Sequence, residues 1–230
     1  MSTYRIPALA APDEVLPRGP FRPGFPSAPA HGETERLRQA GLLRRVLADV
    51  HVPGDLPDSP ALRAAALALL VPSSAVAAGP AAAWVHSSGT SRSPEVLDLY
   101  DLPPHRRGPD LGTLPQRLRC GRLAPHEICR IGPLRLTTAE RTALDLLCWS
   151  PPRYALEALL VLARDTGLDA GRTRLALERR ADRRGVVAAR RVLAVWAALD
   201  ADADAVAGQN PNRHRNVPQI AAEARPGSRG

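Results

Sequence analysis

The amino-acid sequence predicts an α+β protein in which a mixed α/β part is followed by a helical segment. Short runs of β-type residues alternate with alanine-rich helical runs up to residue 136, which indicates strands and helices within one domain. From residue 137 onward the apolar residues recur at helical spacing, and Gly167 provides a helix stop. The 230 residues suffice for one large domain or two small ones.

The first 58 residues divide into a leader and a short ordered segment. Residues 1–32 hold many prolines and little periodicity, which is typical of a disordered leader. In residues 33–58, the run TERLRQAG predicts a helix that breaks at Gly41. The run that continues through Val50 and Val52 to Pro53 predicts β structure.

Residues 59–136 alternate between helices and strands. Ser59 is placed as an N-cap and Pro60 as the first residue of a helix that extends to Val71. The other elements expected in this stretch are a helix over Pro80–Trp84, strands over Pro94–Leu99, Arg117–Arg122 and Glu127–Leu136, and a polar loop over Pro103–Asp110.

The segment LTTAERTALDL, residues 136–146, joins the last of these strands to a helix. Thr137 is placed to cap that helix, and Glu140 follows at the spacing of a capping box, in which two backbone N–H groups are satisfied reciprocally. Arg141 and Asp145 are four residues apart, so they share a helical face and can form an ion pair. The residues expected to stabilise this joint are Thr137, Thr138, Arg141, Thr142 and Asp145.

The chain after this joint is predicted to be helical. Helices are expected over Tyr154–Asp165, Arg172–Ala181 and Val186–Leu199. Residues 59–200 are therefore expected to form one α+β domain, and residues 201–230 a disordered tail.

The basic charge of the chain is carried by arginine alone. There is no lysine, and 31 arginines against 23 acidic residues leave a net charge of +8. Eight arginines and two acids lie between Arg172 and Arg191, and Arg44 and Arg45 form a smaller basic pair. Such clusters can hold phosphates of a nucleic acid, but they can equally be solvated surfaces of an arginine-rich chain. Both interpretations stay open.

Several function classes are disfavoured by the sequence. We expect no membrane span, because the most apolar stretch, Ala64–Val71, is far shorter than the ~20 residues that a membrane helix needs. The scattered cysteines and the lack of a signal peptide favour a cytoplasmic protein. Phosphate-cradling loops and hydrolase motifs are missing from the sequence, so we expect no cofactor and no catalytic residue. His126 and Glu127 in PHEICR would face opposite sides of a strand, so we expect no metal site.

Four segments, in order along the chain, resemble one bacterial family. TTAERTALDL resembles the T-s-x-x-R-T-x-x-D-L segment of AbiEi-like antitoxins of type IV toxin–antitoxin systems. LLRRVLADVHVP resembles the segment that ends the winged-helix part of that group. SPALRAAALALLVPSSAVAAGPAAAWVH and RRADRRGVVAARRVLAVW resemble two further segments, and the likeness covers roughly residues 42–199.

The resemblance implies a degenerate winged-helix-like part at residues 33–58, which would supply the wing, and an AbiEi-like α+β domain at residues 59–200. It implies a shortened form without the C-terminal endonuclease-like domain of longer relatives. The expected function is that of a non-catalytic antitoxin or transcriptional regulator, with an operator in double-stranded DNA and a nucleotidyltransferase-like toxin as partners. The alternative is a protein-interaction module of the same family that does not bind DNA. The expected DNA-binding residues are Arg44, Arg45, Arg172, Arg174, Arg179, Arg180, Arg183, Arg184, Arg190 and Arg191.

Overall fold

The computed structural model describes residues 4–5, 31–48, 50–87, 92–100, 114–179 and 185–208. Most of the proline-rich leader, the expected loop over Pro103–Asp110 and residues 209–230 of the tail lie outside these residues. The described part is mixed α/β, which confirms the predicted α+β class.

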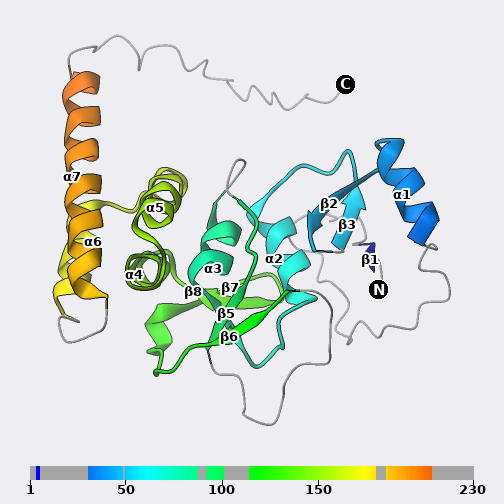
Figure 1. Cartoon of the computed structure of the whole chain (residues 1–230), viewed down its shortest axis with the longest axis horizontal. Coiled ribbons are helices and arrows are strands. Elements are labelled where there is room, and N and C mark those ends of the chain that lie inside the picture. Colours follow the sequence, from blue (N-terminus) through cyan, green and yellow to red (C-terminus); the bar gives the residue numbers. More distant parts are fainter. Residues whose placement is uncertain are drawn as a thin grey trace, which may run out of the picture.

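Two sheets and the helices around them make up the described structure (Figure 1). The strands are β1 (Tyr4–Arg5), β2 (Leu43–Leu47), β3 (Val50–Pro53), β4 (Val76–Ala78), β5 (Leu97–Tyr100), β6 (Gln116–Leu118), β7 (Ile128–Ile131) and β8 (Leu134–Thr137). The helices are α1 (His31–Gln39), α2 (Pro60–Ala68), α3 (Gly79–His86), α4 (Ala139–Trp149), α5 (Pro152–Thr166), α6 (Ala170–Glu178) and α7 (Val186–Gly208), with a 3-10 turn over Pro125–Glu127.

The two sheets differ in size and connection. The smaller has the order β1-β3-β2, with β2 and β3 as an antiparallel hairpin and β1 parallel to β3. The larger has the order β6-β5-β4-β8-β7, in which β4 runs antiparallel to β5 and parallel to β8. The central place of β4 makes it the strand that joins the two halves of this sheet.

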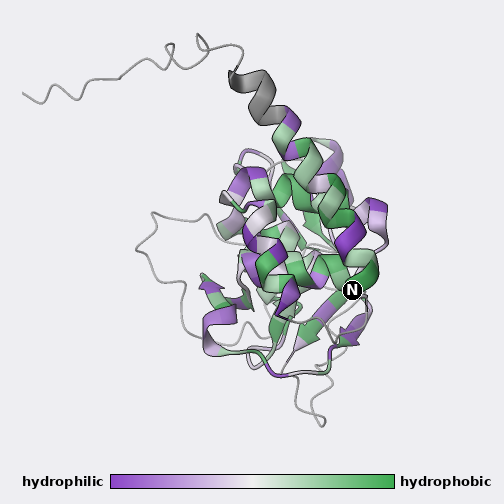
Figure 2. Ribbon diagram, turned by 90° about the vertical axis from the view of Figure 1, so that its left-hand side faces the viewer, coloured by the Kyte–Doolittle hydropathy of each residue, from purple (hydrophilic) through white to green (hydrophobic). Residues whose placement is uncertain are grey.

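The two largest of the four clusters of buried apolar side chains in the described residues lie next to each other. Leu67 of α2 and Val85 of α3 belong to a core that also contains Leu99 and Leu136 of the larger sheet. A second core lies between helices α4, α5, α6 and α7 and includes the fully buried Trp196. Figure 2 shows hydrophobic residues, in green, alternating with hydrophilic ones along the helices. The helices α3 and α4 are in contact, so the two cores adjoin.

Local sequence signals explain several element boundaries. The Ser59 hydroxyl accepts a hydrogen bond from the backbone N–H of Leu62 at 3.2 Å, and Pro60 opens α2, as predicted. Helix α5 ends at Gly167, whose φ of 70° lies in the left-handed region that glycine adopts without strain. The short helix predicted over Pro80–Trp84 is α3.

Other boundaries differ from the prediction. The single strand expected over Glu127–Leu136 is a hairpin, because Gly132 turns the chain between β7 and β8 with a φ of 55°. Strand β4 was not predicted, because its residues are Val-Ala-Ala, without alternation. Helix α7 continues to Gly208, beyond residue 201 where the tail was expected to begin.

Candidate nucleic-acid interface

The segment TTAERTALDL joins β8 to α4, and the cap of α4 lies one residue later than predicted. Thr138 is the N-cap of α4, and its hydroxyl accepts a hydrogen bond from the backbone N–H of Arg141 at 3.4 Å. The predicted cap at Thr137 is wrong, because Thr137 is still paired with Ile128 as the last residue of the strand. With Thr138 as the cap, the third helical residue is Arg141 rather than Glu140, so the expected capping box does not form.

Thr137 has a different structural role at the strand end. Its side chain is fully buried, and its hydroxyl oxygen lies 2.7 Å from that of Thr142. The Thr142 hydroxyl also donates to the Thr137 carbonyl oxygen at 3.2 Å. His86 Nε2 donates to the same carbonyl oxygen at 2.7 Å. These bonds connect β8 to the first turn of α4 and to the end of α3.

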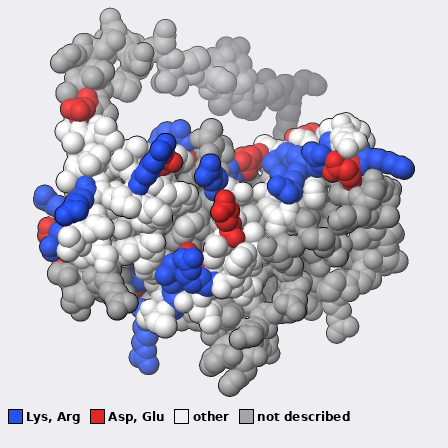
Figure 3. All heavy atoms as spheres, in the orientation of Figure 1, with Lys and Arg blue, Asp and Glu red and all other residues white. Residues whose placement is uncertain are grey.

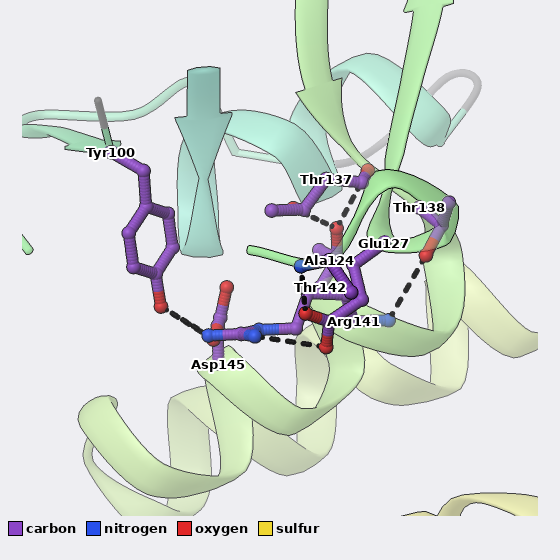
Figure 4. A network of polar contacts seen from close by, with 8 residues as sticks. All are labelled: Tyr100, Ala124, Glu127, Thr137, Thr138, Arg141, Thr142 and Asp145. Carbon is purple, nitrogen blue, oxygen red and sulfur yellow. Dashed lines mark hydrogen bonds and ion pairs between the residues drawn. The ribbon is translucent and has the colours of Figure 1, made fainter. Parts of the chain in front are cut away.

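Arg141 lies at the centre of a buried polar network (Figure 4). Its Nε donates to Asp145 Oδ1 at 2.9 Å, which confirms the predicted ion pair. Its Nη1 donates to Glu127 Oε1 at 2.9 Å, and its Nη2 donates to the hydroxyl oxygen of Tyr100. Glu127 Oε2 in turn accepts from the backbone N–H of Ala124 at 2.9 Å. One guanidinium therefore connects α4 with β5 and with the turn that precedes β7.

The electrostatics of this network keep its charges fixed near neutral pH. Burial would lower the pKa of Arg141, but the charge and hydrogen bond of Asp145, together with Tyr100 and the Glu127 hydrogen bond, outweigh burial and raise the pKa. Burial raises the pKa of the Tyr100 hydroxyl, and the Asp145 charge adds to that shift. Neither group is brought toward a pKa at which it could exchange a proton at neutral pH. The arrangement is that of a structural joint.

A second buried arginine, Arg63 of α2, has a comparable role. It is 2% exposed and donates from Nε to Asp58 Oδ1 at 2.9 Å. Its Nη1 donates to the carbonyl oxygens of Trp84 and Ser87, both at 2.8 Å. Because these carbonyls end α3, the positive charge of Arg63 complements the negative end of the helix dipole. Arg63 thus fixes α2 against the C-terminal end of α3.

The hairpin arginines lie at the end of the molecule opposite α7 (Figure 1). Arg45 of β2 is exposed. Arg44 is partly buried and donates from Nη2 to the Leu56 carbonyl oxygen at 2.9 Å, which holds the hairpin to the following turn. Of the predicted pair, Arg45 presents its charge to solvent, while one N–H group of Arg44 is used within the fold.

Helix α1 places two further arginines beside the hairpin. Glu35 accepts two hydrogen bonds from Arg38, at 2.8 and 2.5 Å. The Arg38 hydrogen bond lowers the pKa of Glu35 to about 2, so this carboxylate stays ionised and neutralises Arg38. Arg36 is exposed on the same helix. Sequence reasoning missed Arg36, although an arginine-bearing helix directly before a β hairpin is a readable signal.

Close packing fixes α1 relative to the hairpin. The backbone N–H of Gly54, just after β3, donates to the Leu42 carbonyl oxygen at 3.0 Å. A Cβ atom at Gly54 would lie 2.3 Å from the Gly41 carbonyl oxygen, so only glycine permits this approach. We call Arg36, Arg44 and Arg45, with α1 and the β2–β3 hairpin that carry them, the α1–hairpin surface. Figure 3 shows basic side chains over α1 and β2, with acidic side chains among them.

The C-terminal arginines do not form one continuous surface. Arg172 of α6 and Arg179, the C-cap of that helix, are seven residues apart and lie on one side, whereas Arg174 points to the opposite side. Arg172 lies 3.4 Å from Asp169 and Arg174 lies 3.9 Å from Glu178, so acids lie close to both. Arg190 and Arg191 are exposed on α7. The remaining members of the predicted set, Arg180, Arg183 and Arg184, lie outside the described residues.

The described residues also bear on the metal and membrane expectations. Pro125–Glu127 is a 3-10 turn rather than part of a strand, with His126 exposed and Glu127 buried against Arg141. Within the residues that the structure describes, no cluster of three or more His, Cys, Asp or Glu side chains could hold a metal ion. No helix in the same part of the chain has both the length and the apolar character needed to cross a membrane.

Comparison with known proteins assigns no relative. No family model, curated protein or solved structure matches the chain.

Proposed function

We propose that the chain is a non-catalytic, DNA-binding transcriptional regulator of the kind that its resemblance to AbiEi-like antitoxins implies. The observation that carries the proposal is the α1–hairpin surface, in which a short helix that bears two arginines directly precedes a two-stranded hairpin with two more. The order β1-β3-β2 of the small sheet supports a winged-helix interpretation of this end. The operator DNA of a bacterial regulator lies in the cytoplasm, so the proposal includes a cytoplasmic location.

The dimensions and charges of the surface suit duplex DNA. A major groove admits an α-helix or a two-stranded β ribbon, and the α1–hairpin surface offers both side by side. Arg36 and Arg45 are exposed at this end, where their guanidinium groups can bond phosphate oxygens. Arg44 would add a contact through the N–H groups that Leu56 does not use. The C-terminal arginines would add a weaker, partly neutralised contribution.

The proposed function is non-catalytic, because the polar side chains that the described fold brings together bond one another and stabilise the fold. Arg141, Tyr100, Glu127 and Asp145 bond one another in the interior. The pKa values of Arg141 and Tyr100 are shifted further from neutral pH. An acid–base catalyst needs the opposite, a pKa close to the pH at which it works. The family motif thus supports the scaffold that carries the α1–hairpin surface.

A second candidate function is a protein-interaction module that does not bind DNA. Large apolar side chains are exposed on the C-terminal helices, which favours contact with a protein. These side chains are Leu160, Leu175, Val187, Val195 and Leu199. A nucleotidyltransferase-like toxin is the partner that the resemblance implies for this part.

A salt series separates the two candidates. The purified chain would be titrated against a labelled duplex from upstream of its own gene and against a shuffled duplex, between about 50 and 200 mM salt. We expect the chain to bind the duplex. The slope of the logarithm of the binding constant against the logarithm of the salt concentration should become shallower by ~0.9 for each phosphate contact that a substitution removes. The variant pair Arg36→Gln with Arg45→Gln should flatten the slope.

The matched control removes the same charge at the other end, through Arg172→Gln with Arg174→Gln, and should leave the slope nearly unchanged. If the unmodified chain binds neither duplex at the lowest salt, the regulator proposal is wrong and the interaction module is favoured. If only the control pair flattens the slope, the DNA-binding surface lies on the C-terminal helices instead.

A further inference from the structure

Helix α7 has an outer face that nothing in the described fold covers. Its inner face, with Val192, Leu193 and Trp196, is buried against the other C-terminal helices. Val187, Val195 and Leu199 are 68%, 49% and 42% exposed on the remaining surface. In Figure 1, α7 lies at the edge of the molecule, beside α6.

A basic residue lies at one end of this outer face and an acidic residue at the other. Arg191, Val195, Ala198 and Asp202 are all exposed and follow one another at spacings of three or four residues, so they form one stripe along the helix. Arg191 and Asp202 are eleven residues apart, about 16 Å along the helix, too far to bond each other. Neither has an ion pair among the residues that the structure describes. The centre of the stripe is apolar and small.

The spacing of this stripe is self-complementary. If two copies of α7 lie antiparallel about a two-fold axis that passes between Trp196 and Ala197, each residue faces the one equally far on the other side of the axis. Arg191 of one copy then faces Asp202 of the other, and this happens twice by symmetry. Val195 faces Ala198, and the alanine lets the two helices approach closely.

We propose that the outer face of α7 pairs with the α7 of a second copy of this chain, antiparallel and about a two-fold axis. Charge complementarity indicates a second copy of this chain as the partner. A single two-fold axis places the two apolar centres together and also pairs the oppositely charged ends of the stripe. A two-helix contact buries less surface than a standard protein interface, so the dimer is weak and concentration-dependent. Its ion pairs are exposed at the edges and are weakened by salt.

Sedimentation of the full chain over a concentration series at low salt tests the pairing. We expect the unmodified chain to pass from monomer to dimer as its concentration rises. Arg191→Glu would place two acids opposite each other at each end, and Asp202→Arg would place two arginines there. Each of these changes should weaken association by about tenfold, because two attractive contacts become repulsive.

The charge swap that combines Arg191→Glu with Asp202→Arg restores opposite charges across the axis and should recover most of the association. Arg190→Glu is the matched control, because Arg190 is exposed on the same helix but points about 100° away from Arg191. Circular dichroism of each variant verifies that α7 stays folded. A chain that remains monomeric at every concentration overturns the proposal. So does a folded charge-swapped variant that associates no better than the single variants, or an Arg190→Glu variant that is weakened as much as Arg191→Glu.

Discussion

Replacing Arg141 with methionine tests whether the buried network holds the fold together. Methionine keeps the length of the side-chain stem but removes the guanidinium, which donates to Asp145, Glu127 and Tyr100. The side chain of Asp145 is only 4% exposed, so its carboxylate would lose its cation without gaining water. Breaking a buried ion pair by removing one partner costs about 3–5 kcal/mol. Since a typical domain is stable by about 5–15 kcal/mol, this change should bring the chain close to unfolding.

Urea unfolding, followed by tryptophan fluorescence, measures this loss. Trp149 is a suitable reporter because its ring lies 5.7 Å from that of Tyr100. The control Arg153→Met removes an arginine whose side chain is 94% exposed on α5 and should cost less than ~0.5 kcal/mol. Adding Asp145→Leu to Arg141→Met should regain at least ~1 kcal/mol, because the buried carboxylate that has lost Arg141 is removed as well. A loss below ~1 kcal/mol for Arg141→Met alone would show that the network contributes little.

Two further predictions concern a close backbone contact and a buried histidine. Gly185→Ala should lower the free energy of unfolding by at least ~2 kcal/mol, because a Cβ at this position would lie 2.5 Å from the Cys148 carbonyl oxygen. Gly167→Ala is the control: its Cβ would meet open space, so this change should cost only ~1 kcal/mol for the positive φ. Equal losses of the two variants in urea unfolding would contradict this prediction. Burial lowers the pKa of His86 in the folded chain below its ordinary value of 6.5. As the pH falls, the histidine is therefore protonated in the unfolded chain before it is protonated in the folded chain. The free energy of unfolding then falls below pH 6.5, by at most ~1.4 kcal/mol per pH unit. His86→Gln keeps a donor for the Thr137 carbonyl oxygen and should have a flatter stability curve over that range; parallel curves would argue against the assignment.

Local signals were enough to predict the elements whose causes lie within a few residues. Ser59 and Pro60 start α2, and Gly167 ends α5, because caps and stops act over one turn. The Arg141–Asp145 pair could be predicted because both partners are on one helix. The cap of α4 was placed one residue early because TT offers two adequate caps, and strand pairing, which is not local, decides between them.

Contacts between distant segments explain what sequence reasoning missed. Strand β4 is an alanine-rich tripeptide that forms because β5 and β8 bond it from both sides. Tyr100 and Glu127 reach Arg141 from positions 41 and 14 residues earlier, and no periodicity in the sequence marks either of them. Only the assembled sheet brings β5 and the Pro125–Glu127 turn to α4.

The placement of the arginines shows why net charge alone is a poor guide to nucleic-acid binding in this chain. Arg63 and Arg141 are almost fully buried and each bonds several groups at once, which the planar guanidinium permits and which a lysine ammonium would do less well. Arg119 is also used internally, since it bonds Asp98 at 2.8 Å and lies 4.0 Å from the centre of the Trp149 ring. In a chain without lysine, arginine therefore serves both the interior and the surface. A DNA-binding hypothesis must rest on exposed residues such as Arg36 and Arg45, whose charges face solvent at one end of the molecule.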